Sequence, residues 1–187
     1  NLYTSHDGYQ IGHLIEAAVG HYRATGKKNY LDIACKAADQ AWRHFIEQKN
    51  PGFPGHAEIE LALVELYRVT GNRNYLDLSR EVIERRGQDP DRKMEKWSLD
   101  YWQDHLPIRQ QTEIKGHAVR AVFLATGVAD VALETGDPSF REAARQLWTS
   151  ATRRKMYVTG SVGSRPHGEA FGDDYELPNR TAYCESC

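Results

Sequence analysis

The chain has 187 residues, with 24 basic and 26 acidic side chains and a formal net charge of −2 at pH 7. This balance gives no electrostatic reason to expect nucleic acid or an anionic membrane surface as a partner. No run of about 18 apolar residues occurs, so we expect no membrane-spanning helix, and the length suffices for one domain with its own core.

Apolar residues recur at helical spacing near the start of the chain. The first set ends before Gly26, a residue type that often terminates helices, and comprises Ile11, Leu14, Ile15, Ala18, Val19 and Tyr22. A second helix is predicted over residues 30–47. The glycine- and proline-rich residues 51–55 then predict a turn.

The same pattern returns after this turn, with an apolar helical face over residues 59–67 and an end at Gly71. The segment ATGKKNYLD at residues 24–32 reappears as VTGNRNYLD at residues 69–77, and a looser third copy spans residues 116–154. The sequence therefore predicts an all-α fold of three helical hairpins, with residues 156–159 as a candidate short strand. Three hairpins are about half of a six-hairpin toroid, and the alternative is a helical scaffold that binds another protein.

Each predicted hairpin opens with a glycine followed by a histidine, and these histidines are His13, His56 and His117. Composition alone would give about 0.6 such pairs, so the excess follows the repeat. In a toroid, we expect the three imidazoles to converge at one mouth of the central cavity. A helix N-terminus disfavours imidazolium, and neutral rings suit the binding of sugar hydroxyls or of a metal. The alternative is that each histidine packs at a helix start without a function.

Residues 88–111 interrupt the repeat and combine aromatic rings with amide, acid, imidazole and guanidinium groups. The residues concerned are Trp97, Tyr101, Trp102, Gln103, Asp104, His105 and Arg109. Aromatic faces for stacking and polar groups for hydroxyls are what a carbohydrate pocket requires. A surface loop anchored by its tryptophans is the alternative, and Asp104 and His105 are a candidate orienting pair.

Residues 156–187 show no sustained period and are rich in glycine, proline and acids. Glu169 follows Gly168, which allows the backbone to approach a ligand, and we expect Phe171 to desolvate the carboxyl group and raise its pKa. Such an acid can protonate a leaving group near neutral pH. Asp173 and Asp174 are instead expected to be solvated.

The chain contains three cysteines, Cys35, Cys184 and Cys187, and an odd number does not suit a disulfide framework. A reducing compartment, with the cytoplasm favoured, or a metal role for the C-terminal pair fits better. Residues 184–187 read CESC, so two thiols and the Glu185 carboxylate are available, fewer than the four ligands of a structural zinc site. Two ordinary helix-start cysteines are the alternative. Because the chain begins with Asn1 and ends inside this motif, we expect a partial domain over residues 1–187, truncated at both ends.

Several motifs in order resemble one family along essentially the whole chain. They are GHLIEAA at residues 12–18, PGH at 54–56, EIELA at 58–62, GHAVRA at 116–121, GEAF at 168–171, and LPN at 177–179 leading into ESC at 185–187. This series resembles the β-L-arabinofuranosidase family of glycoside hydrolases. The resemblance implies that the chain is part of an (α/α)6 barrel catalytic domain.

The resemblance also implies a retaining enzyme that removes terminal β-L-arabinofuranose from glycans or glycoproteins with a zinc-bound cysteine nucleophile. Glu169 matches the general acid/base, Glu185 and Cys187 match two zinc ligands, and the sugar-site histidines match His13, His56 and His117. The family's nucleophile and a further cysteine ligand lie downstream of Cys187. We therefore expect this chain alone to be inactive and to hold zinc weakly at best.

Two other functions stay open on the sequence. Another (α/α)-toroid sugar-active enzyme would share the histidine-lined cavity but would not need the zinc pair. A non-enzymatic helical-repeat binding module would make Glu169 and the C-terminal thiols incidental. Nothing in the sequence indicates the oligomeric state.

Overall fold

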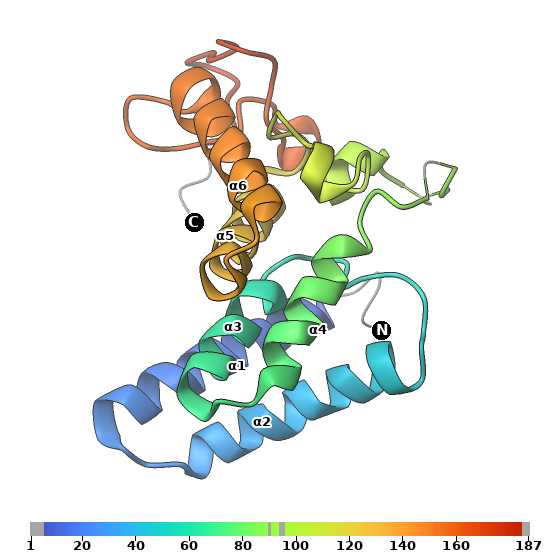
Figure 1. Ribbon diagram of the computed structural model, residues 1–187. Coiled ribbons are helices and arrows are strands. Elements are labelled where there is room, and N and C mark those ends of the chain that lie inside the picture. Colours follow the sequence, from blue (N-terminus) through green and yellow to red (C-terminus); the bar gives the residue numbers. More distant parts are fainter. Residues whose placement is uncertain (1–5, 90, 94–95, 185–187) are drawn as a thin grey trace.

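The computed structural model describes residues 6–89, 91–93 and 96–184. Within these residues the chain forms six α-helices, which are α1 (Asp7–Thr25), α2 (Asn29–Trp42), α3 (Ile59–Thr70), α4 (Arg73–Glu84), α5 (Ala118–Thr135) and α6 (Pro138–Ser150) (Figure 1). Single π-helical turns prolong α2 and α6, and short 3-10 turns lie at Leu99–Trp102, Ile108–Gln110 and His167–Glu169. The described residues include isolated β-bridges but no strand, so the predicted all-α class is confirmed. None of the described helices is long and apolar enough to cross a membrane.

The six helices form three hairpins that repeat one another. Each hairpin turn has a glycine with a positive φ that donates its N–H to the preceding helical turn, and these glycines are Gly26, Gly71 and Gly136. A left-handed residue at this place satisfies a terminal carbonyl and reverses the chain, and glycine adopts it without a steric cost. The first helices of the hairpins, α1, α3 and α5, are neighbours, with α3 in the middle (Figure 1). Three successive helical hairpins in this order form part of an (α/α)6 barrel.

Helix α3 lies at the centre of the packing. Leu63 and Leu66 contribute to a core shared with α1, α2 and α4, whereas Val64 belongs to a second core shared with α4, α5 and α6. The backbones of α1 and α5 also approach the start of α3 closely. A Cβ atom at Gly12 would lie 2.9 Å from the nitrogen of Ile59, and one at Gly127 would lie 2.9 Å from Cβ of Glu60. The start of α3 is therefore held closely against both α1 and α5.

Helix α1 is longer than its apolar face, and the expected short strand is wrong. Helix α1 begins at Asp7, before Ile11, because the carbonyl of His6 accepts the N–H of Gln10 and adds a polar first turn. His13 consequently lies in the second turn of α1. Residues 156–159 form a tight turn rather than a strand, closed by a hydrogen bond from the N–H of Gly160 to the carbonyl of Tyr157.

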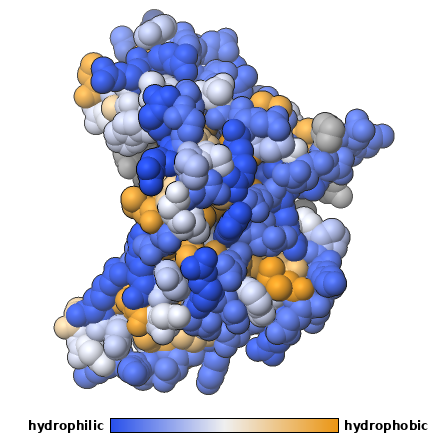
Figure 2. Space-filling model, in the orientation of Figure 1, coloured by the Kyte–Doolittle hydropathy of each residue, from blue (hydrophilic) through white to orange (hydrophobic). Residues whose placement is uncertain are grey.

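The surface in the orientation of Figure 1 is mostly hydrophilic, with apolar side chains gathered in small groups (Figure 2). Leu133 and Trp148 are the most exposed large apolar side chains of α5 and α6. The site described below lies at the starts of α1, α3 and α5, on different residues from these.

Candidate active site

Aromatic side chains from all three hairpins form a row at the starts of the first helices. Tyr9 and His13 lie one turn apart on α1, so they share a face of that helix, while His56 precedes α3 and His117 precedes α5. The ring centroids are 4.3 Å apart for Tyr9 and His13, 4.4 Å for Tyr9 and His56, and 5.7 Å for His56 and His117. The structure thus brings together the three histidines singled out in the sequence. Tyr9 was missed, although its spacing of four residues from His13 on an amphipathic helix was a usable signal.

His117 joins this row to the candidate acid. Its Nδ1 atom accepts the backbone N–H of Arg120 at 3.4 Å, so the histidine acts as the N-cap of α5. A ring nitrogen that accepts carries no proton, so the proton of the neutral ring is on Nε2. Nε2 lies 3.0 Å from Oε2 of Glu169, and this geometry makes His117 a hydrogen-bond donor to the Glu169 carboxylate.

His56 is buried and neutral. Its Nδ1 atom lies 2.7 Å from the carbonyl oxygen of Ala57, to which it donates, so Nε2 keeps its lone pair. Burial, and then the positive charge of Arg120, lower the pKa of His56 to about 3. His56 is therefore a hydrogen-bond acceptor at neutral pH, and His117 next to it is a donor.

A strained turn holds Glu169. Gly168 and Glu169 both have left-handed backbone angles, with φ of 72° and 50°. A non-glycine residue in this conformation is uncommon and persists only when its surroundings fix it. Here Arg165 and Ala170 exchange two backbone hydrogen bonds, and the N–H of Phe171 donates to the carbonyl of Gly116 at 2.9 Å. The turn is thereby attached to the residue that precedes His117.

The expected desolvation of Glu169 by Phe171 is not observed. The Phe171 side chain packs in the core with apolar residues of α5, whereas the side chain of Glu169 is 44% exposed. The backbone turns away from the core between these two residues, because Phe171 is tied to Gly116. The carboxyl group is thus open to a ligand on one side and bonded to His117 on the other.

Lys155 anchors the same loop and was not identified from the sequence. Its Nζ atom is almost fully buried and lies 2.6 Å from the Glu113 carboxylate, 3.2 Å from the carbonyl of Ile114 and 2.9 Å from the carbonyl of Gly172. These bonds connect the end of the π-helical turn after α6 to the residues before His117 and to the residues after Glu169. A lysine at the end of a helical segment gives no sequence signal of this role, because its partners, one carboxylate and two backbone carbonyls, are remote in the sequence.

The insert at residues 88–111 contributes an aromatic wall. Trp97 and Tyr101 are stacked with centroids 4.7 Å apart, and Tyr101 lies 5.2 Å from the ring of His117. They line a cavity of about 430 Å³ together with charged residues such as Lys115 and Arg165. Trp102 instead is buried and lies under the guanidinium of Arg120. Both interpretations of the insert therefore apply: Trp97 and Tyr101 line a cavity, and Trp102 anchors the loop in the core.

Other polar residues of the insert have structural partners. Asp104 and His105 do not orient each other, because Asp104 accepts the N–H of Gly87 and pairs with Arg92, while His105 approaches Asp100. Burial lowers the pKa of His105 below its usual value. Two further residues of the insert also bond to the protein: Arg109 links Glu84 of α4 to Asp137 before α6, and the amide of Gln103 donates to the carbonyls of Asp100, Tyr101 and Lys115.

Asp173 and Asp174, which the sequence predicts to be solvated, lie at the surface. Asp173 pairs with Arg165 and Asp174 with Arg154, both at the surface. Cys184 is exposed, and its N–H donates to the carbonyl of Gly163. The two candidate zinc ligands, Glu185 and Cys187, lie outside the described residues.

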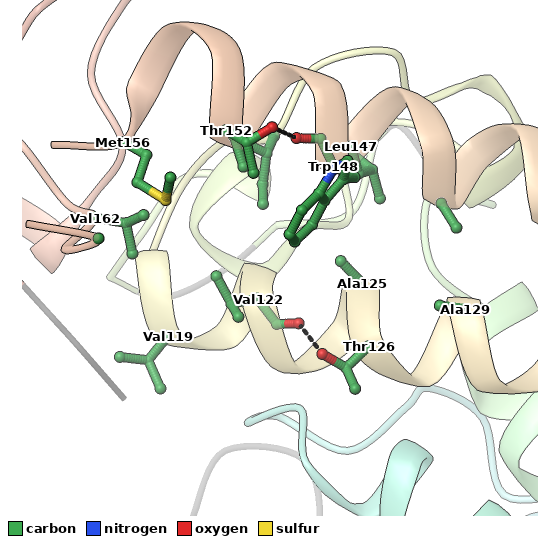
Figure 3. Close-up of a pocket in the computed structure, with 14 residues that line it drawn as sticks. Val119, Val122, Ala125, Thr126, Ala129, Leu147, Trp148, Thr152, Met156 and Val162 are labelled. Carbon is green, nitrogen blue, oxygen red and sulfur yellow. Dashed lines mark hydrogen bonds between the residues drawn. The ribbon is translucent and has the colours of Figure 1, made fainter. Parts of the chain in front are cut away.

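A second cavity, of about 380 Å³, lies between α5 and α6 (Figure 3). Its lining is apolar and includes Val119, Val122 and Leu147. The hydroxyls of its two threonines, Thr126 and Thr152, donate to carbonyls of their own helices. Because the lining has neither an acid nor an imidazole, this cavity is not a candidate catalytic centre.

The chain matches one protein family over its whole length. A model described as "Beta-L-arabinofuranosidase, GH127 catalytic domain" matches residues 1–187. A non-reducing end β-L-arabinofuranosidase from Bifidobacterium longum subsp. longum is 42% identical over 203 residues, which cover 100% of this chain and 31% of that protein.

Solved structures agree. A GH127 β-L-arabinofuranosidase from Geobacillus stearothermophilus T6 superposes with a TM-score of 0.91 at 47% identity, over 96% of this chain and 31% of that one. A second GH127 β-arabinofuranosidase gives a TM-score of 0.87 at 47% identity, over 97% of this chain and 28% of that one. The chain thus spans about a third of the length of the relatives it matches.

Proposed function

Because this chain belongs to the GH127 family of β-L-arabinofuranosidase catalytic domains, we propose that it is part of a retaining β-L-arabinofuranosidase. The substrate would be a glycan or glycoprotein with a terminal β-L-arabinofuranose. The observation that supports this most directly is the contact of 3.0 Å between His117 and Glu169, beside the neutral ring of His56. A proton donor next to oriented hydrogen-bonding groups is what glycoside hydrolysis requires.

Glu169 acts as the general acid/base in this proposal. In its protonated form it delivers a proton to the departing glycosidic oxygen, and in the second step it removes a proton from the attacking water. The open side of the carboxyl group admits both the leaving group and the water. His117 orients it through Nε2, and the rigid turn at Gly168 fixes the position of its backbone.

The histidine row binds the sugar. His56 offers an Nε2 lone pair, because its Nδ1 proton is committed to the carbonyl of Ala57. An uncharged imidazole at this place accepts a hydrogen bond from a sugar hydroxyl. Tyr9 separates His56 from His13 and provides an apolar ring against which a furanose can pack. His13 is the third sugar-binding histidine in the proposal.

Zinc is the proposed cofactor, and Glu185 and Cys187 are the residues of this chain that would hold it. A carboxylate and a thiolate are suitable zinc donors, and they would supply two of the four ligands that zinc usually has in proteins. Bound zinc would keep a coordinated thiol in its thiolate form at neutral pH. The proposed nucleophile is a cysteine that this chain does not contain.

The other functions compatible with the sequence receive less support. Another toroidal sugar enzyme, or a helical binding module, would also explain hairpins and histidines. Family membership over the whole chain favours the arabinofuranosidase. The stack of Trp97 on Tyr101 next to the Glu169 turn also suits a site that receives a carbohydrate.

The test is hydrolysis of an aryl β-L-arabinofuranoside by the complete protein, with the α-anomer as control substrate. The proton NMR spectrum of the first product should show β-L-arabinofuranose, that is, retained configuration, and metal analysis should show zinc. Release of the inverted anomer would exclude the retaining mechanism, and equal rates on both anomers would exclude the proposed specificity.

A further inference from the structure

A buried carboxyl group lies behind His13. Glu58, immediately before α3, has a side chain that is 0% exposed, and its Oε1 atom lies 3.2 Å from Nδ1 of His13. Glu16, one turn after His13 on α1, approaches the same nitrogen at 3.6 Å. Among the described residues, neither carboxyl oxygen of Glu58 has a hydrogen-bond partner of ordinary geometry. The proposed function does not use Glu58.

The surroundings of Glu58 disfavour a negative charge. The nearby buried guanidinium, Arg86, is committed to Glu60 at 2.8 Å. Burial, and then the neighbouring carboxyl group of Glu16, raise the pKa of Glu58 to about 9. A carboxylic acid kept protonated at neutral pH can donate one hydrogen bond and accept others.

The contact with His13 is imposed by helix packing and not by chain proximity. Helix α1 approaches Glu58 with its backbone at Gly12, where a Cβ atom would lie 3.0 Å from the carboxyl carbon of Glu58. Any larger residue at position 12 would push α1 away from α3. Glycine at position 12 therefore allows the close approach of α1 to α3 that places His13 next to the buried Glu58 side chain.

We propose that Glu58 is a positioning residue that sets the tautomer of His13. Its carboxylic acid group accepts the Nδ1 proton of His13 as a hydrogen bond and donates its own proton to Glu16. Nε2 of His13 is then left as an acceptor for a sugar hydroxyl. His56 has the same arrangement, since its Nδ1 donates to the carbonyl of Ala57. His117 has the opposite tautomer, because its Nδ1 accepts from Arg120 and its Nε2 donates to Glu169. This inference rests on the proposed sugar site.

The decisive variants are Glu58→Gln and Glu58→Leu in the complete protein, assayed with an aryl β-L-arabinofuranoside. Glutamine reproduces both the acceptor and the donor, so we expect KM and kcat within about twofold of the parent. Leucine fills the space without hydrogen bonds, so we expect KM to rise about tenfold, the equivalent of one hydrogen bond. A Glu58→Gln variant as impaired as Glu58→Leu would overturn the proposal, because it would mean that the carboxylate is required.

A double-mutant cycle separates positioning from a merely structural role. In a His13→Ala background, Glu58→Leu should have no further effect on KM, because both changes remove the same hydrogen bond to the sugar. Additive effects would show that Glu58 does not act through His13, and would contradict the proposal.

Two measurements do not depend on the activity. Infrared difference spectra between the parent and Glu58→Gln at pH 7 should show the carbonyl stretch of a protonated carboxylic acid in the parent alone. If the complete protein has this band but does not hydrolyse arabinofuranosides, the proposed function fails and the protonated acid stands.

His13, Glu16 and Glu58 place ligand atoms within 4.8 Å of one another, so a divalent cation is the competing occupant. A metal equivalent that is lost in Glu58→Gln would overturn the proposal.

Discussion

The Nε2 atom of His117 lies 3.0 Å from Oε2 of Glu169, and this contact joins the start of α5 to a strained turn in the C-terminal loop. The β-bridge between His117 and Ala170 fixes the two backbones beside each other. His117 therefore has two separable roles, the N-cap of α5 and the orientation of the proposed acid.

Replacement of His117 by asparagine separates these roles. Asparagine is a good N-cap, so the free energy of unfolding should change by less than about 0.5 kcal/mol, whereas alanine should lower it by about 1 kcal/mol. Both variants lose the donor to Glu169, and we expect kcat/KM to fall by about 100-fold in each. Thermal unfolding and hydrolysis of an aryl β-L-arabinofuranoside measure the two effects. An asparagine variant with full activity would show that the contact with Glu169 is dispensable.

The burial of His56 predicts a pH dependence of stability. Its pKa is about 3 in the folded protein, against about 6.5 in the unfolded chain. The unfolded state therefore binds an extra proton between these values, and the free energy of unfolding should fall as the pH is lowered from about 6.5 towards 3. Urea denaturation of the parent and of His56→Gln over this range measures the difference. Parallel curves would mean that His56 is not buried as a neutral ring.

Glu58 predicts a dependence of the opposite sign. Its pKa is about 9 when folded, against about 4.3 when unfolded, so the folded state holds the extra proton. This contribution to stability is present below about pH 4.3 and is lost as the pH rises towards 9. Glu58→Gln carries no titrating group, so it should gain stability relative to the parent between pH 5 and 9. A constant difference would indicate that Glu58 is already ionised at the lower pH.

Lys155 should control the order of the loop that carries Glu169. Lys155→Met removes three hydrogen bonds and leaves the carbonyls of Ile114 and Gly172 without this donor, so we expect a loss of about 2–3 kcal/mol in unfolding free energy. Limited proteolysis between residues 160 and 176 should also become faster. Arg145→Met is the matched control, because its pair with Glu142 is exposed and should not matter measurably. Equal behaviour of the two variants would contradict the anchoring role.

The sequence predicts the hairpins and the three histidines because both follow local rules. Gly26, Gly71 and Gly136 mark the hairpin turns by one recurrent chemical requirement, a left-handed residue after a helix. Glu58 and Lys155 could not be identified in this way. Their burial and their partners come from the packing of helices remote in sequence, which no periodicity records.

The position of the Glu169 side chain relative to the core also could not be predicted from the sequence. Proximity of Phe171 along the chain suggested an apolar cover for the carboxyl group, but the left-handed turn directs the two side chains to different surroundings. The partial domain predicted for residues 1–187 stays a prediction. If it is correct, the isolated chain should not hydrolyse an aryl β-L-arabinofuranoside and should lose zinc readily on dialysis.

Glu169→Ala in the complete protein tests whether Glu169 is the general acid/base. On a substrate with a poor leaving group, kcat/KM should fall by about 10²–10⁴, and azide should restore turnover on an activated aryl substrate and yield β-L-arabinofuranosyl azide. The exposed Glu142→Ala should behave like the parent. Undiminished hydrolysis by Glu169→Ala, or a loss that azide does not relieve, would show that Glu169 is not the general acid/base.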